Sequence, residues 1–149
     1  MQAFRIARSL SPLLLALLLS AAHAHDVVEA APQHHKALME NETVRVLETR
    51  IAAGERTPVH TRQWPASLYV VSWSDFIRYD PSGNVLLDSR TMATTPKPGE
   101  ALWSPPGVAH SIHNVGTTGL LVIAVEIKQP HALDEAAPPG SLRELALRV

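Results

Sequence analysis

The chain has 149 residues, of which 46% are hydrophobic and 18% charged, and it contains 8 histidines and no cysteine. This length predicts one domain, and the composition excludes a disordered chain. The formal net charge of −1 gives no basic field for nucleic acid, which is therefore excluded as a partner. The lack of cysteine excludes disulfides, thiolate metal sites and a cysteine nucleophile, so any metal site has to use histidine and oxygen ligands.

Residues 1–24 have the pattern of a secretory signal peptide. Arg5 and Arg8 precede an apolar run over residues 13–19, and small residues then place the cleavage before His25. The run is too short for a membrane span, which needs about 20 apolar residues. We therefore expect a periplasmic or secreted protein that has no contact with a membrane after cleavage.

The N-terminal part of the mature chain, residues 25–42, is expected to be a loose arm in which His34 and His35 form a solvated pair. The pattern changes at residue 43. Residues 44–51 alternate imperfectly between apolar and polar types, which is typical of a half-buried strand.

Further strands are predicted wherever β-branched and aromatic residues stand between turn signals rich in Gly and Pro. They cover residues 67–74, 76–79, 85–89, 101–103, 109–115 and 120–127. Strands that recur every 8–12 residues or so, without a helical period between them, predict an all-β sandwich or barrel.

Residues 129–149 predict a linker and a short C-terminal helix. The stretch that begins at Ser141 and has Glu144 three residues later matches a helix capping box. Leu142, Leu145 and Val149 follow a helical spacing and would dock on the β-domain. A frayed tail is the alternative for so short a segment.

The stretch 99–114 carries the most specific pattern of the chain, G-x5-P-x-G-x2-H-x3-N. The fixed positions are Gly99, Pro105, Gly107, His110 and Asn114. This pattern resembles the second signature motif of the cupins. The resemblance implies a cupin-type double-stranded β-helix, a jelly-roll barrel, over residues 43–128. It also implies that His110 is a metal ligand and that Asn114 fixes the turn after its strand.

The first cupin motif, G-x5-H-x-H-x3–4-E-x6-G, is only half present. Gly54 and His60 match it, but Arg62 stands where the motif has its second histidine, and the glutamate position falls on Ala66 or Ser67. The resemblance therefore implies two of the four family ligands, His60 and His110. A third ligand would have to come from another side chain, for which we consider Glu126, Glu48 or Gln63. His113 is expected on the opposite strand face from His110.

Arg62 separates two hypotheses about function. Residues two apart in a strand share a face, so Arg62 is expected to point where His60 points. A guanidinium repels a cation but pairs in bidentate fashion with a carboxylate. Alternatively, Arg62 turns out to solvent or pairs with a glutamate inside the barrel.

The leading hypothesis is an exported cupin that binds a small anionic organic molecule in the barrel pocket. The pocket is expected to consist of His60, Arg62, Trp64, Tyr69 and His110. The alternative is a metal-dependent enzyme (an oxygenase, isomerase or lyase) in which His60 and His110 hold a divalent transition metal. The resemblance implies a homodimer in either case. A third hypothesis has no ligand at all: the barrel is then a dimer module in which residues 43–51 and the C-terminal helix make the contacts.

Overall fold

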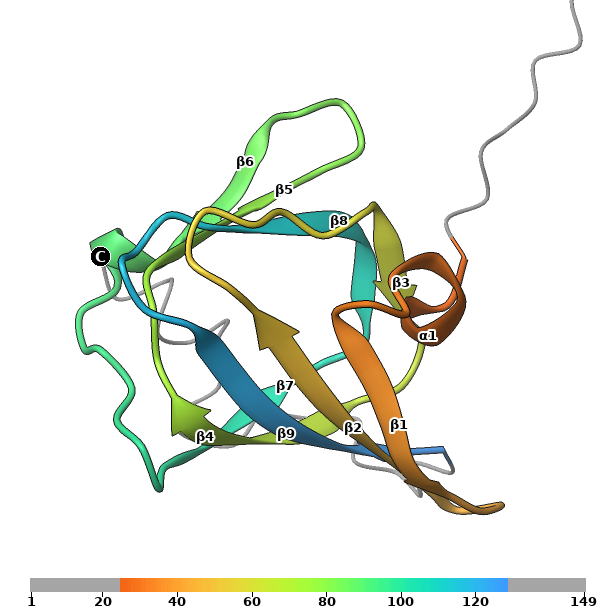
Figure 1. Cartoon of the computed structure of the whole chain (residues 1–149). Helices are drawn as coiled ribbons and strands as arrows, with labels where there is room; N and C mark the ends of the chain where they lie inside the picture. Colours follow the sequence, from red (N-terminus) through yellow and green to blue (C-terminus); the bar gives the residue numbers. More distant parts are fainter. Residues whose placement is uncertain (1–24, 129–149) are drawn as a thin grey trace, which may run out of the picture.

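The computed structural model describes residues 25–128 as two antiparallel sheets that face each other across one core (Figure 1). The chain passes repeatedly between the sheets, as in a double-stranded β-helix, and the predicted all-β class is confirmed. In spatial order, the five-stranded sheet contains β1 (His35–Glu40), β2 (Val44–Ile51), β9 (Leu120–Ile127), β4 (Ala66–Ser72) and β7 (Ala101–Ser104). The four-stranded sheet contains β3 (His60–Arg62), β8 (Gly107–Asn114), β5 (Phe76–Tyr79) and β6 (Val85–Asp88).

The predicted strands and turns agree closely with the observed ones. β2 and β9 have the predicted bounds, and β5 and β6 form a hairpin that extends from the body at the top of Figure 1. The turns at Gly54 and Gly99 require glycine, because the φ angles there are 79° and 93°, a region that disfavours a side chain. Both glycines belong to the motifs that carry the cupin resemblance, so their role is to turn the chain into the neighbouring strand.

The prediction of a loose arm over residues 25–42 is wrong. This segment contains helix α1 (Val27–Ala30), which begins where the Asp26 carboxylate accepts a hydrogen bond from the backbone N–H of Val28, and strand β1. Val27 is fully buried in the core, and β1 pairs with β2 in antiparallel fashion. The pattern did not reveal β1 because it is an edge strand whose last five residues are all exposed, so it has no apolar alternation.

The interior is apolar in one part and polar in another. The apolar core includes Leu47, Ile51, Val70 and Ala124, all fully buried, from strands of the five-stranded sheet. The inward positions of β2 run Arg45, Leu47, Thr49, Ile51, so polar and apolar side chains alternate along one strand inside the molecule. Such a polar interior is costly unless its groups are paired, and it therefore marks the place to look for a site.

The predicted signal peptide (1–24) and C-terminal linker and helix (129–149) lie outside the described residues, so both stay predictions. Within residues 25–128, no helix is long and apolar enough to span a membrane.

Candidate functional site: a buried histidine–arginine cluster

Three histidines from three strands meet inside the molecule. The ring of His60 on β3 lies between that of His35 on β1, at 4.8 Å between ring centres, and that of His110 on β8, at 4.6 Å. His60 and His110 are register partners in the β3–β8 pair, so the strand pairing itself sets their contact. The three residues are only 0–2% exposed.

Hydrogen bonds hold two of the imidazoles in one tautomer. Nδ1 of His60 lies 2.9 Å from the Pro58 carbonyl oxygen, and Nδ1 of His110 lies 2.7 Å from the Val108 carbonyl oxygen. A carbonyl can only accept, so Nδ1 carries the proton in both rings and Nε2 keeps a free lone pair. Nδ1 of His35 lies 2.9 Å from the Thr49 hydroxyl, which can donate or accept.

The three Nε2 atoms have no partner among the described residues, although all are buried. Leaving a buried polar atom unpaired costs about 1–3 kcal/mol, and such atoms often mark a missing water, ion or ligand. Three of them on adjacent rings therefore indicate an occupant that supplies hydrogen-bond donors or a cation.

Burial keeps the imidazoles neutral at physiological pH. Loss of solvation disfavours the charged ring and lowers the pKa of His60 to about 4 and that of His110 to about 3. It also holds the pKa of His35 far below its ordinary value. The guanidiniums of Arg62 and Arg78 lower the pKa of His60 and His110 further.

Arg62 also points inside, as the spacing from His60 predicted, but its charge is already compensated. Its Nη1 donates to Oε1 of Glu126 at 3.4 Å, and its Nη2 donates to the Thr49 hydroxyl at 3.2 Å. The two alternatives to anion binding for Arg62 are exposure to solvent and pairing with an interior glutamate. In the structure, Arg62 pairs with the interior Glu126.

Glu126 also accepts a hydrogen bond from a second arginine, Arg45. Nε of Arg45 donates to Oε2 of Glu126 at 2.6 Å. The two terminal nitrogens of Arg45 donate to the two carboxylate oxygens of Asp26, at 2.8 and 2.9 Å. Burial raises the pKa of Asp26, but the hydrogen bonds from Arg45 and from the backbone of Val28, together with the charge of Arg45, outweigh it, and the net pKa is lowered. The network holds two positive and two negative groups, so it is neutral as a whole.

Arg78 on β5 is a half-buried cation that this network leaves out. It is the register partner of Ile112, a core residue, and its Nε is buried without a hydrogen-bond partner. No ion pair joins it to a carboxylate in residues 25–128. Burial and the charge of Arg62 lower its pKa to about 10, so it stays positive at neutral pH. Arg78 was not among the predicted site residues, although its position two residues after the apolar Phe76 was a usable signal.

Two other predicted site residues lie elsewhere. Tyr69 is 49% exposed between buried Leu68 and Val70, so it faces away from the interior, which corrects the expectation that it lines the same site. The ring of Trp64 lies against Arg45, 4.7 Å from its guanidinium carbon, and against Lys128. Trp64 therefore covers the charged network.

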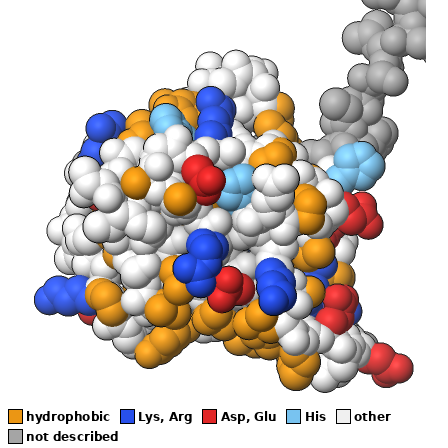
Figure 2. Space-filling view, in the orientation of Figure 1, with side chains coloured by type: hydrophobic (Ala, Val, Ile, Leu, Met, Phe, Trp, Pro, Cys, Tyr) orange, Lys and Arg blue, Asp and Glu red, His pale blue; other side chains and the backbone are white. Residues whose placement is uncertain are grey.

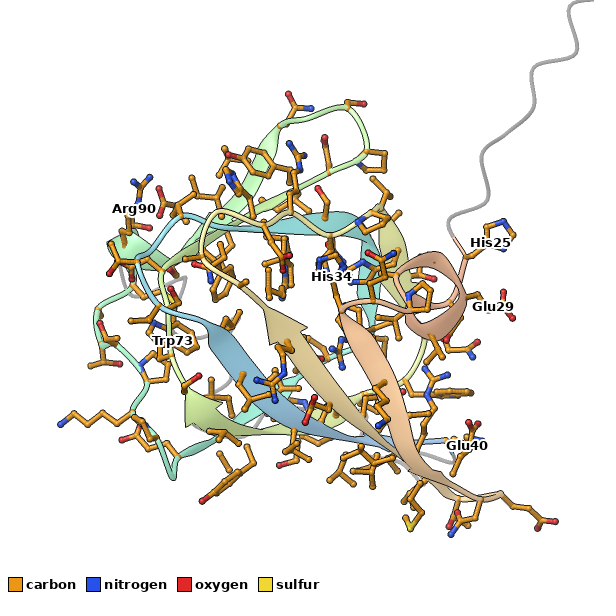
Figure 3. The ribbon with its side chains drawn as sticks, in the orientation of Figure 1. His25, Glu29, His34, Glu40, Trp73 and Arg90 are labelled. Carbon is orange, nitrogen blue, oxygen red and sulfur yellow. The ribbon has the colours of Figure 1, made fainter. Side chains whose placement is uncertain are left out.

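The expectation for His34 and His35 is also wrong. His34 and His35 are not a solvated pair: His35 is 1% exposed, and the side chain of His34 is 11% exposed near Glu55. Figure 3 shows His34 among the side chains of the body, whereas His25 and Glu29 point away from it. His113 is half-buried beside Ile77 and Arg56, on the other face of β8 from His110, as predicted.

The cluster offers nitrogen donors that suit a divalent transition metal, but its present geometry and charge oppose one. In the described part of the chain, no group of three or more His, Asp or Glu side chains has an arrangement that could hold a metal ion. Glu126, considered as a third ligand, is bound by two arginines, while Glu48 pairs with Arg50 and Gln63 is exposed. The residues as they lie do not fit a metal centre.

Comparisons with known proteins concern the fold. No family model and no curated protein matches the chain. Among solved structures, it is similar to a cupin domain from Bordetella pertussis Tohama I, with a TM-score of 0.52 and 23% identity, over 64% of this chain and 92% of that one. An RmlC-like cupin family protein with a double-stranded β-helix fold from Methanocaldococcus jannaschii has a TM-score of 0.47 and 18% identity, over 68% and 84%. At these sequence identities the similarity shows the fold alone and indicates no ligand for this chain.

Proposed function

We propose that this chain, which has the double-stranded β-helix fold of the cupin superfamily, binds a small organic acid at the histidine–arginine cluster. The observation that carries the proposal is the buried Nε of Arg78, which has no hydrogen-bond partner among residues 25–128, beside imidazoles whose Nε2 atoms lack one as well. The carboxylate of the ligand pairs with Arg78, since a guanidinium binds carboxylates in bidentate fashion. Arg78 thus takes the anion-binding role that the sequence predicted for Arg62.

The imidazoles define the other half of the ligand. Because Nδ1 of His60 and of His110 donates to a carbonyl, each Nε2 can only accept a hydrogen bond. The ligand therefore carries hydroxyl or amine groups near its carboxylate, as a small hydroxy acid does. The histidines are 0–2% exposed, so the ligand is small and a covering segment has to move to admit it.

Binding can be tested on residues 25–149 by calorimetry with glycolate, lactate, malate and gluconate, against acetate, propionate and succinate as acids without hydroxyl groups. We expect the hydroxy acids to bind more tightly, and Arg78→Gln to weaken binding at least about tenfold, since a charged hydrogen bond contributes about 1.5–3 kcal/mol. Arg56→Gln is the matched control, because Arg56 also has no carboxylate partner within residues 25–128 but lies over the Tyr79 ring on the other face of β5. Equal affinities for the wild type and Arg78→Gln would refute the proposal.

The second candidate is a metal-dependent cupin enzyme that uses His60 and His110. The observation in its favour is the pair of Nδ1–H bonds to carbonyl oxygens, since metal-binding histidines are usually oriented in this way. The guanidiniums of Arg62 and Arg78 argue against it. Metal analysis of protein prepared without a chelating tag, before and after incubation with Zn²⁺, Ni²⁺ and Fe²⁺, tests the second candidate. A metal content near one ion per chain supports the metal-dependent enzyme, and a metal content near zero contradicts it.

Export is the remaining part of the proposal. It is supported by the basic and apolar pattern of residues 1–24, and every residue of the cluster follows the expected cleavage site before His25. Expression in a bacterial host with both signal and signal-free forms tests it. We expect periplasmic protein with His25 at its N-terminus from the first form only; an uncleaved cytoplasmic product from both forms would contradict it.

A further inference from the structure

The outer face of the five-stranded sheet is unusually apolar for a sheet that meets water. An antiparallel sheet with one solvated face normally places polar residues outward. Here the outward positions include Val46 of β2, Ile123 and Val125 of β9, and Tyr69 and Val71 of β4, which we call the outer apolar face. Tyr69 is 49%, Val71 41% and Val125 36% exposed.

The strand register joins these side chains into one surface. Val46 is opposite Val125 across the β2–β9 pair, and Tyr69 is opposite Ile123 across the β4–β9 pair. Figure 2 shows hydrophobic side chains gathered along the lower margin of the molecule, where Figure 1 places β4, β9 and β2. Exposed apolar surface that continues over neighbouring strands commonly marks a contact with another segment or protein.

The chain beyond the described residues supplies a fitting segment. Residues 129–149 follow directly from β9, the middle strand of this sheet. Leu142, Leu145, Ala146 and Val149 have the spacing of one apolar helix stripe, and the capping box at Ser141 gives that helix a start. The linker over residues 129–140 can extend to about 40 Å, whereas five strands are only about 24 Å across.

We propose that residues 141–149 form a helix that lies across the outer apolar face, with Leu142 and Leu145 against Val125 and Tyr69. The two surfaces have matching chemistry: both are rows of aliphatic side chains, and the helix places its arginines, Arg143 and Arg148, off the apolar stripe. Attachment to β9 gives the segment an effective concentration in the millimolar range, above that of a second chain in dilute solution. The inference does not depend on the proposed ligand.

The absence of cysteine from the chain makes a cross-linking test unambiguous. Under mild oxidation, the Val125→Cys/Leu145→Cys variant of the full mature chain is expected to form a disulfide within one chain, at least tenfold faster than the control. The control is Val108→Cys/Leu145→Cys, because Val108 is 72% exposed on β8 of the other sheet. Equal rates for the two variants, or a disulfide that joins two chains, would overturn the proposal.

A second measurement separates the helix from a second copy as occupant. Leu142→Glu/Leu145→Glu is expected to raise the binding of a hydrophobic dye several-fold by uncovering the face, whereas Arg143→Gln/Arg148→Gln leaves it unchanged. Sedimentation of the same proteins gives the oligomeric state. If the wild type is a dimer, and the leucine variant is also a dimer with the same low dye binding, a second copy of the chain covers the face and the proposal is overturned.

Discussion

Glu126 is the residue on which the charge balance of the interior depends. It accepts from both Arg45 and Arg62 and is fully buried. Glu126→Gln leaves the two guanidiniums with Asp26 as their only carboxylate, and removing one partner of a buried ion pair costs about 3–5 kcal/mol. We expect a loss of this size in the free energy of unfolding, measured in urea.

Glu48→Gln is the matched control for this measurement. Glu48 pairs with Arg50 at 3.3 Å on the exposed side of β2, where an ion pair contributes about 0–1 kcal/mol. If both variants lose the same small free energy, the interior network does not stabilise the fold in the way its geometry indicates.

Arg62 is the residue that sets this interior apart from the first cupin motif. Arg62→His removes a cation and adds an imidazole on the face of His60, which leaves the Glu126 carboxylate with one arginine. We therefore expect this variant to retain more Zn²⁺ after dialysis than the wild type, near one ion per chain. Arg62→Gln, which removes the charge without adding a ligand, controls for electrostatics. A ratio of zinc to protein that is unchanged in Arg62→His contradicts this expectation.

The inward direction of Arg62 was predictable, whereas that of His35 was not. Arg62 follows from the period of a strand anchored by a motif residue, His60. The side chain of His35 turns inward only because β1 pairs with β2, and a pairing between an exposed edge strand and its neighbour leaves no pattern in the sequence. The outward direction of Tyr69 was predictable from the strand period, because its apolar neighbours Leu68 and Val70 occupy the opposite face of β4.

At the scale of elements, Asn114 joins the end of β8 to the segments around it. It is fully buried, and its Nδ2 donates to the carbonyl oxygens of Ile51 and Thr118 at 2.9 and 2.8 Å. Its Oδ1 accepts from the Ser74 hydroxyl at 2.7 Å and from the Gly116 backbone N–H at 3.1 Å. The amide therefore holds four groups, in agreement with the turn-fixing role that the motif implied.

Asn114→Ala removes these four hydrogen bonds, two of which, those with Ser74 and Ile51, are fully buried. At about 1 kcal/mol for each net hydrogen bond, the variant is expected to lose about 2–4 kcal/mol of unfolding free energy. Asn84→Ala is the control, since Asn84 donates only to Asp80 in an exposed turn and is expected to lose less than about 1 kcal/mol. Urea unfolding followed by tryptophan fluorescence gives both values. Equal losses would show that the junction is not held by the amide.

The two strands whose bounds the sequence predicted best left different signals. The bounds of β2 followed from its imperfect alternation of apolar and polar residues, and those of β9 from a continuous apolar run that ends before Pro130. β1 gave neither signal, because it lies at an edge and a bulge between Ala37 and Met39 breaks its alternation. Periodicity reports burial on one side of an element, and an edge strand that is exposed on both sides gives no such signal.

At the scale of the whole molecule, the cluster is assembled from strands far apart in the chain. His35, His60, Arg78 and His110 come from β1, β3, β5 and β8, and Glu126 comes from β9. The motif spacing indicated that His60 and His110 meet, and their rings do lie 4.6 Å apart. The contacts of Arg78 and His35 depend on how the two sheets are placed, which only the fold determines.

This assembly predicts that the molecule is sensitive to mild acid. The folded state holds the pKa of His60 at about 4 and that of His110 at about 3, with the pKa of His35 also lowered, whereas an unfolded histidine titrates near its ordinary pKa of 6.5. The unfolded chain therefore binds more protons between about pH 6.5 and 4, so stability is full above this range and falls as the pH falls through it. Each neutral imidazole accounts for a loss of roughly 2 kcal/mol at pH 5, up to about 6 kcal/mol for the three.

Urea unfolding at pH 7 and pH 5 measures this loss above the range in which most carboxylates titrate. His60→Gln removes one of the three groups and is expected to reduce the difference between the two pH values by roughly a third. His25→Gln is the control, because His25 lies at the exposed N-terminal end of the described chain, away from the cluster. If His60→Gln and His25→Gln keep the same pH dependence as the wild type, the acid sensitivity does not originate in the buried imidazoles.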